Sequence, residues 1–178
     1  MTELKSIVSA LMLTALFACS SQRDNIDKIA KLESVLYDDL QEAFNPQAAE
    51  NLIAEYELFV LTYPKDTMAP EYLFKAAELA MAISSSARAL KLYGTVYQDY
   101  PNHHKAGTSL FLMGFVNDDQ LKNLVEARKY YQQFIAEFPE HNLTDDATFS
   151  LENLGKSDED IIREFEAMHA KTNQQDSL

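Results

Sequence analysis

The chain has 178 residues, of which 47% are hydrophobic and 24% charged, so one folded domain with its own core is expected. Only four glycines occur, and Ala, Leu, Glu and Lys dominate, which favours an all-helical protein. The net charge is −13, also without residues 1–18, and no Lys/Arg cluster is present, which argues against nucleic acid or a bare anionic membrane as partner. A solvated surface explains this acidity, and a basic partner is compatible with it.

The N-terminal 18 residues are predicted to be a lipoprotein signal peptide. Residues 6–18 form an apolar run of signal-peptide length, too short to span a bilayer comfortably. The run ends in LFAC, which resembles a bacterial lipobox with Leu16, Ala18 and Cys19 in the matching positions. The resemblance implies cleavage before Cys19 and its acylation, palmitate included, and several acyl chains together hold a protein on a bilayer. The alternative is a buried N-terminal helix.

Residues 19–24 are polar and are predicted to be a short lipidated tether. Cys19 is the only cysteine, so no intrachain disulfide can form. By resemblance to the enterobacterial sorting rule, an aspartate directly after the lipidated cysteine would favour retention in the inner membrane. This chain has Ser20 at that position. The expected location is therefore the periplasmic face of the bacterial outer membrane, with the lipid as the membrane contact.

Three aromatic–proline pairs recur along the rest of the chain. They are Tyr63-Pro64, Tyr100-Pro101 and Phe138-Pro139, with the prolines 37 and 38 residues apart. Twelve residues before the three prolines stand Leu52, Ala89 and Ala127. Eight residues before them stand Tyr56, Tyr93 and Tyr131, and five residues before them Phe59, Val96 and Phe134. The three residues before any one proline are therefore four and three residues apart, a spacing that places them on one face of a helix. This recurrence predicts a repeat of two helices that ends at each proline.

The residues after each proline also repeat. Ten residues after it stand Phe74, Phe111 and Phe149. Thirteen residues after it, Ala77 and Gly114 are small enough for close helix packing, whereas Glu152 breaks the pattern in the last repeat. The whole unit resembles the tetratricopeptide repeat, whose second helix carries A-x3-F and ends near a proline. The resemblance implies an all-α, right-handed α-solenoid of helix hairpins with C-terminal capping helices.

The expected helices follow in chain order. They span residues 24–44, 47–62, 66–83, 85–99, 104–117, 122–137, 144–154 and 158–170, with turns at 84–86 and 117–120. Asn45 is predicted to cap the second helix, with Pro46 in its first turn. Thr144 and Ser157 are predicted N-caps, and Ser157 with Asp160 approaches a capping box.

The predicted repeat domain covers residues 25–170. It divides into units at about 33–66, 70–103 and 107–141 and a cap at 144–170 that closes the core. Residues 171–178, KTNQQDSL, are expected to be a disordered tail.

No catalytic motif is present, so neither enzyme activity, a cofactor nor a small-molecule substrate is expected. Two equivalent loops contain histidines: His103 and His104 in one, and His141 in the other. They are interpreted as polar loop residues, and a metal site shared by the two loops is the alternative. The pairs Asp118-Asp119 and Asp145-Asp146 lack the alternating spacing of a calcium loop. No metal site is therefore predicted.

Tetratricopeptide arrays bind extended peptides or helices on a concave face, and mapping that pattern gives candidate contact residues. These are Tyr37, Phe44, Phe74, Glu78, Met81, Phe111, Phe115 and Asp118. Aromatic residues beside acidic groups suit a partner segment with apolar anchors and some positive charge. Phe74 and Phe111 recur in phase with the repeat and fit core positions as well, whereas Met81, Phe115 and Phe44 are less regular.

The segments FVLTYPKDTMAPEYLFKAAELA and YYQQFIAEFPEHNLTDDATFSLENL resemble envelope lipoproteins of the BamD type. Such proteins serve the machine that inserts β-barrels into the outer membrane, usually with about five repeats, where this chain has three and a cap. The resemblance implies a scaffold that binds β-barrel assembly components or their substrates. A cell-division coordinator of the envelope, which shares the repeat spacing, and a structural spacer between outer membrane and cell wall are alternatives. An enzyme or ligand-binding subunit would need a polar pocket.

Overall fold

The computed structural model describes residues 22–37 and 44–175. The predicted signal peptide and Cys19 lie outside this part of the chain. The elements of these two ranges are all helical, without a strand, so the all-α prediction is confirmed. Nowhere in these ranges is a helix both long and apolar enough to cross a membrane.

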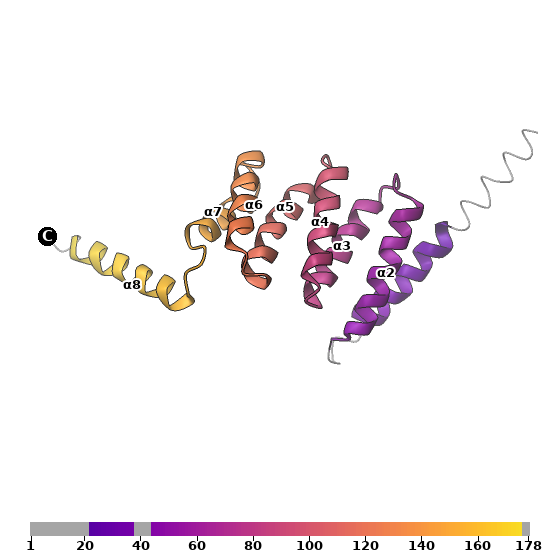
Figure 1. The fold of residues 1–178 in the computed structure, drawn as a ribbon, viewed down its shortest axis with the longest axis horizontal. Helices are drawn as coiled ribbons and strands as arrows, with labels where there is room; N and C mark the ends of the chain where they lie inside the picture. The colour runs from indigo at the N-terminus through magenta and orange to yellow at the C-terminus, as the bar shows by residue number, and fades with distance from the viewer. Residues whose placement is uncertain (1–21, 38–43, 176–178) are drawn as a thin grey trace, which may run out of the picture. The chain divides into compact units, whose positions relative to one another are not determined.

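The chain forms two compact units, one up to Ser85 and one from Ser86. The first contains a helix over 22–37, α2 (Pro46–Thr62) and α3 (Ala69–Ala82), and α2 packs against α3. The second contains α4 (Ser86–Asp99), α5 (Lys105–Phe115), the π-helical turn η1 (Val116–Gln120), α6 (Leu124–Glu137), α7 (Thr144–Glu152) and α8 (Asp158–Gln175). Within it, α4 packs against α5, α5 against α6, and α6 against α7 (Figure 1). This packing of consecutive helices is that of a tetratricopeptide-like solenoid.

The core contains the residues that the proline spacing predicts. All nine stripe positions on α2, α4 and α6 are at most 1% exposed. Among them Tyr56, Tyr93 and Tyr131 are the largest fully buried side chains. The predicted repeat is confirmed at these positions, because helical spacing fixes which side chains face the neighbouring helix.

The same backbone turn follows all three aromatic–proline pairs. The amide of the aromatic residue still donates to the carbonyl four residues earlier: Tyr63 to Phe59 at 2.7 Å, Tyr100 to Val96 at 3.2 Å and Phe138 to Phe134 at 2.8 Å. Proline has no amide hydrogen and cannot extend the helix. Two residues after proline, the chain turns back: Asp66 donates to Tyr63 at 3.0 Å, His103 to Tyr100 at 2.9 Å and His141 to Phe138 at 3.0 Å.

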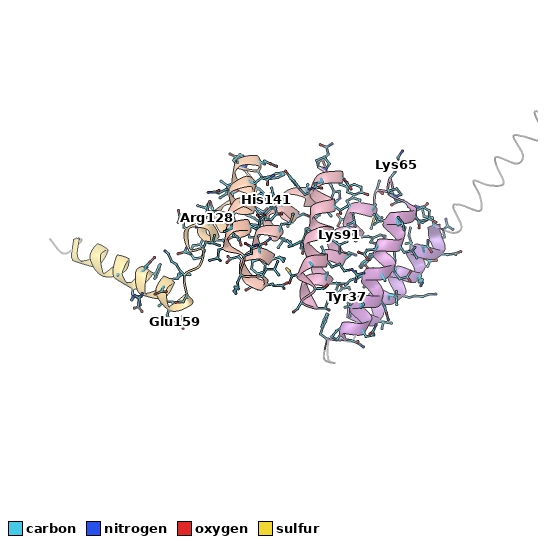
Figure 2. All side chains as sticks on the ribbon, in the orientation of Figure 1. Tyr37, Lys65, Lys91, Arg128, His141 and Glu159 are labelled. Carbon is cyan, nitrogen blue, oxygen red and sulfur yellow. The ribbon has the colours of Figure 1, made fainter. Side chains whose placement is uncertain are left out.

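A side chain stabilises each of these turns in the same way. The residue two after proline accepts a hydrogen bond from an amide two residues later: Asp66 Oδ1 from Met68 at 2.7 Å, His103 Nδ1 from Lys105 at 3.3 Å and His141 Nδ1 from Leu143 at 3.1 Å. The ring of His141, which is labelled in Figure 2, also meets Phe134 edge-on, with centroids 5.2 Å apart. His103 and His141 thus have a structural function in their loops.

Most helix ends lie within three residues of the predicted ones, and two predicted caps are confirmed. The Asn45 side chain accepts from the amides of Gln47 and Ala48, and Ser157 Oγ accepts from the Asp160 amide at 3.2 Å. The predicted cap at Thr144 is wrong. Leu143 holds that position, because the Thr144 hydroxyl donates to the Phe138 carbonyl at 2.9 Å in the preceding loop.

Two expected boundaries differ from the structure at the ends of the described part. Residues 22–24 of the predicted tether already belong to the first helix. The helix α8 continues to Gln175, five residues into the predicted tail, since neither proline nor glycine interrupts it there.

Gly114 on α5 allows α6 to approach closely. A Cβ at this position would lie 2.7 Å from Cδ1 and Cε1 of the buried Tyr131 ring. Gly94 on α4 differs, because a Cβ there would meet only Cε of Met113, at 3.7 Å. The small residue predicted at 114 is therefore required by packing.

We expect Gly114→Ala to destabilise the chain by about 1–3 kcal/mol, because the rigid ring of Tyr131 must move. Gly94→Ala is the matched control and should stabilise it by about 0.5–1 kcal/mol, through helix propensity and a less flexible unfolded chain. Urea unfolding followed by circular dichroism measures both. Equal stability of the wild type and Gly114→Ala would show that this approach does not constrain the fold.

We expect Asp66→Ala to lower the free energy of unfolding by about 1 kcal/mol, because the Met68 amide loses its acceptor. Asp66→Asn keeps an oxygen at the same place and should retain most of the stability. The two variants are compared in the same unfolding assay. A loss of the same size in both would assign the effect to the carboxylate charge.

Candidate functional site

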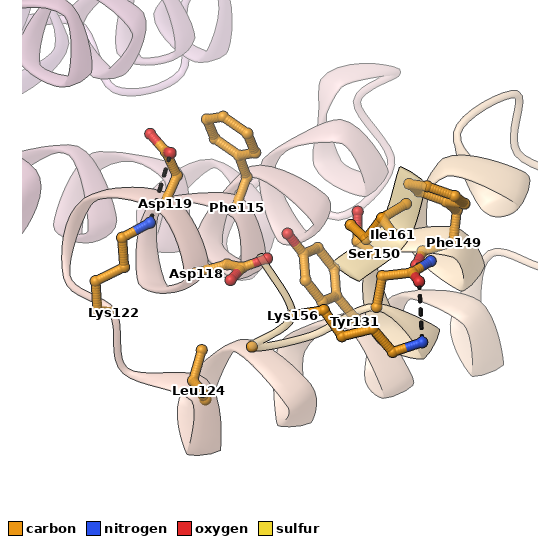
Figure 3. A pocket seen from close by; sticks show the side chains of 12 residues that line it. Phe115, Asp118, Asp119, Lys122, Leu124, Tyr131, Phe149, Ser150, Lys156 and Ile161 are labelled. Carbon is orange, nitrogen blue, oxygen red and sulfur yellow. Dashed lines mark hydrogen bonds and ion pairs between the residues drawn. The ribbon is translucent and has the colours of Figure 1, made fainter. Parts of the chain in front are cut away.

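A cavity of about 580 Å³ opens in the second unit (Figure 3). Its walls come from the end of α5, from η1, from α6 and α7, from the segment that leads into α8 and from the start of α8. Aromatic, acidic and basic side chains all line it, so the cavity has both apolar and charged walls.

The turn η1 places the acidic side chains. The helix α5 continues without interruption into η1, where the Leu121 amide donates to the Val116 carbonyl at 3.1 Å, five residues back. The buried Asn117 donates through Nδ2 to the Met113 carbonyl at 2.8 Å and anchors the turn. Lys122 then ends the helix with φ of 52°. A π-turn adds a residue to a helix and often occurs at functional sites.

Asp118 is the carboxylate of the cavity that has no cationic partner. Of the lysines on its walls, Lys122 lies 3.9 Å from Asp119 and Lys156 lies 2.7 Å from Glu164. Within the described ranges, no basic side chain comes within 4.0 Å of the Asp118 oxygens. Burial raises the pKa of Asp118, and the more distant charge of Lys122 only partly opposes this. The charged form of Asp118 is therefore incompletely compensated.

Tyr131 adds a buried hydroxyl without a hydrogen bond to the same cavity. Its side chain is fully buried, and within the described part of the chain its hydroxyl makes no hydrogen bond of normal geometry, although Asp118 and Ser150 lie close enough to interact with it. In Figure 3 the ring stands between Asp118 and Ser150. Burial, and after it the charge of Asp118, raise the pKa of Tyr131 to about 12, so the hydroxyl keeps its proton at neutral pH.

Two exposed aromatic rings complete the cavity. Phe115 is 37% exposed and Phe149 is 57% exposed, and both line it. Phe149 aligns with Phe74 and Phe111 in the repeat, so the sequence pattern places it with the core. The signal against this was Glu152, which occupies the position of Ala77 and Gly114 and marks the end of the regular repeat.

The predicted contact residues of the second unit divide into two groups. Phe115 and Asp118 line the cavity together. Phe111 is half-buried in the core, with its ring centroid 5.8 Å from that of Tyr131 and 5.7 Å from that of Phe134. The pattern did not single out the other wall residues, because most of them come from α6, α7 and the chain after α7.

In the first unit, the predicted contact residues differ in their exposure. Phe74 is buried, at 3% exposed, whereas Tyr37 and Phe44 are about half exposed. Glu78 is exposed and Met81 is partly buried. Burial raises the pKa of Tyr37, and the charge of Lys75 opposes this.

Next to Tyr37, Glu33 connects the helices of the first unit. Its Oε1 accepts from Tyr56 Oη and from Lys75 Nζ, each at 2.6 Å. Burial works against the charged form of Glu33, but these hydrogen bonds outweigh it and hold its pKa below the usual value. In contrast to Asp118, this carboxylate is satisfied within the fold.

Residues 108–141 match the family model of the tetratricopeptide repeat. The match supports a tetratricopeptide-repeat protein, and it covers the end of α5, η1 and α6, which carry Phe115, Asp118 and Tyr131. No curated protein matches the chain. Tetratricopeptide repeats generally mediate protein–protein interaction and are generally not catalytic, which agrees with a binding surface in this region.

We expect Asp118→Asn to stabilise the chain at pH 7, because the uncompensated charge is removed. The pKa of Asp118 is raised by folding, so its ionisation lowers stability as pH rises, and the penalty is absent below about pH 4, where both states are protonated. The stability that Asp118→Asn gains over the wild type should therefore shrink as pH falls from 7 to 4. Melting temperatures across this range measure it.

Asp119→Asn is the matched control for this prediction. It removes the exposed partner of a weak 3.9 Å ion pair and should change the melting temperature little at either pH. A loss of stability in Asp118→Asn at pH 7 would contradict the assignment of Asp118 as uncompensated.

Proposed function

We propose that this protein is a non-catalytic adaptor that binds protein partners and uses the cavity of the second unit as a contact surface. The observation that carries the proposal is the partly buried Asp118, without an ion pair in the described residues, in one cavity with the exposed rings of Phe115 and Phe149, within and next to the segment that matches the tetratricopeptide repeat. A pure spacer would gain nothing from a carboxylate that opposes folding, whereas natural proteins retain such costs at functional sites.

The adaptor is held at the periplasmic face of the bacterial outer membrane by lipidated Cys19, and its partners belong to outer-membrane protein assembly. The lipobox-like LFAC supports the anchor, and the resemblance to BamD-type lipoproteins supports the role. An anchored adaptor meets partners at a high effective concentration, so a contact surface of moderate affinity suffices.

Site-specific photocrosslinking in cells tests the contact surface. The full chain carries benzoylphenylalanine in place of Phe115 or, as control, of Val125, an apolar side chain of α6 that is 77% exposed. Val125 does not line the cavity. We expect a protein adduct from position 115 and little from position 125. Absence of an adduct at 115, or equal adducts at both positions, would contradict this surface as the binding site.

Labelling with radioactive palmitate tests the anchor. The wild type should incorporate label and sediment with the outer membrane, whereas Cys19→Ser should do neither, since the thiol that carries the lipid is absent. Ser20→Cys combined with Cys19→Ser is the control, because it restores a thiol one residue away from the lipobox position. Incorporation of label by Cys19→Ser at the wild-type level would exclude the anchor.

A further inference from the structure

We propose that the cavity between η1, α6 and α7 binds a lysine or arginine side chain of a partner protein, with an apolar neighbour of that residue against Phe115 and Phe149. The inference rests on the proposed adaptor function and names the chemistry that its partner must present. Four features of the described residues lead to it: an unpaired carboxylate, the polarity of a helix end, an unpaired hydroxyl and exposed aromatic rings.

The charge balance of the walls favours a cation. Lys156 is paired with Glu164, and Lys122, which forms only a weak 3.9 Å ion pair with Asp119, partly compensates Asp118 from a greater distance. A bound ammonium or guanidinium would give Asp118 the counter-charge that the fold does not supply, and a charge-assisted hydrogen bond is stronger than a neutral one. A bound carboxylate or phosphate would meet an unpaired negative charge.

The position of Asp118 in its helix strengthens this preference. The continuous helix of α5 and η1 ends at Gln120, so Asp118 and Asp119 lie in its last turn. Carbonyl oxygens point outward at this end, where the helix dipole favours positive charge and disfavours acidic side chains. A cation bound at Asp118 therefore interacts favourably with both the carboxylate and the helix end.

Tyr131 provides a second polar group for the same ligand. Its hydroxyl lines the cavity from α6, is closed to solvent and, within the described part of the chain, makes no hydrogen bond of normal geometry to the nearby Asp118 and Ser150. A buried hydroxyl without a partner costs free energy, which a ligand with several N–H donors can recover. Because the oxygen is closed off, binding includes a small rotation of a wall side chain such as Asp118.

The aromatic rings suit the rest of a basic residue. Lysine and arginine carry an aliphatic stem, which packs on apolar surface while the charged end reaches a polar group. Phe115 and Phe149 offer that surface on the walls of the same cavity, and the faces of their rings attract a nearby cation. The chain's net charge of −13 attracts a basic segment at longer range.

The test is an NMR titration of the full-length, isotope-labelled chain with three capped tripeptides. These are acetyl-Phe-Lys-Leu-amide, the same peptide with norleucine, which keeps the stem but lacks the charge, and the same peptide with glutamate. We expect the lysine peptide to shift amide signals of η1 and of residues 149–156, with at least tenfold tighter binding than the norleucine peptide. The glutamate peptide should not bind.

Variants of the walls assign the effect to named side chains. Asp118→Asn should weaken binding of the lysine peptide about tenfold, and Asp119→Asn, its matched control, less than about twofold. Tyr131→Phe should weaken it about threefold while leaving the melting temperature unchanged or higher, since that hydroxyl makes no hydrogen bond in the free chain. Neither Asp118 nor Asp119 contributes to the core, so loss of fold does not obscure the comparison.

The outcomes separate this inference from the adaptor function itself. Equal binding of the lysine and norleucine peptides, unchanged affinity in Asp118→Asn, or shifts confined to residues of the first unit would each overturn the basic-side-chain site. Tight binding of calcium chloride at the same amides without binding of the lysine peptide would also overturn it. An adduct at position 115 together with any of these results would leave the adaptor function standing and exclude only this ligand chemistry.

Discussion

The second unit depends on the contact between Gly114 and Tyr131. There is no room for a methyl group between them, so α5 and α6 approach as closely as a glycine allows. That approach buries the Tyr131 ring completely and carries its hydroxyl to the cavity wall next to Asp118. One packing constraint thus sets both the distance between two helices and the position of a polar group in the candidate site.

The aromatic–proline turns give the chain its regular framework. Each turn combines a helix end at the aromatic residue with a side-chain acceptor two residues after the proline, and the acceptor is Asp66 in one turn and His103 or His141 in the others. Different residue types serve because the turn needs only an acceptor at that position. The histidines that suggested metal chemistry in the sequence therefore share a role with an aspartate.

The candidate site arises where the repeat stops being regular. Glu152 replaces the small residue of the earlier repeats, and the exposed Phe149 and residues of η1 line one cavity. Glu33 in the first unit shows the contrast, since it is neutralised by Lys75 and bonded to Tyr56, whereas Asp118 has no ion pair in the described residues and only an imperfect contact with the Tyr131 hydroxyl. A satisfied carboxylate contributes to the fold, and an unsatisfied one next to exposed aromatic rings is a contact for another molecule.

Residue spacing alone predicts most of the helices and the buried stripe of the core, although it misplaces the cap at Thr144 and the end of α8. Proline cannot continue a helix, and positions three and four apart share a face, so the spacing from Pro64, Pro101 and Pro139 identified the buried stripe without coordinates. It also identified Phe115 and Asp118 as contact candidates. Only the tertiary structure decided that Tyr131 and Phe149 join them and that Phe74 is buried. Those outcomes depend on how closely helices approach and on where a π-turn points its side chains, which residue spacing along one helix does not encode.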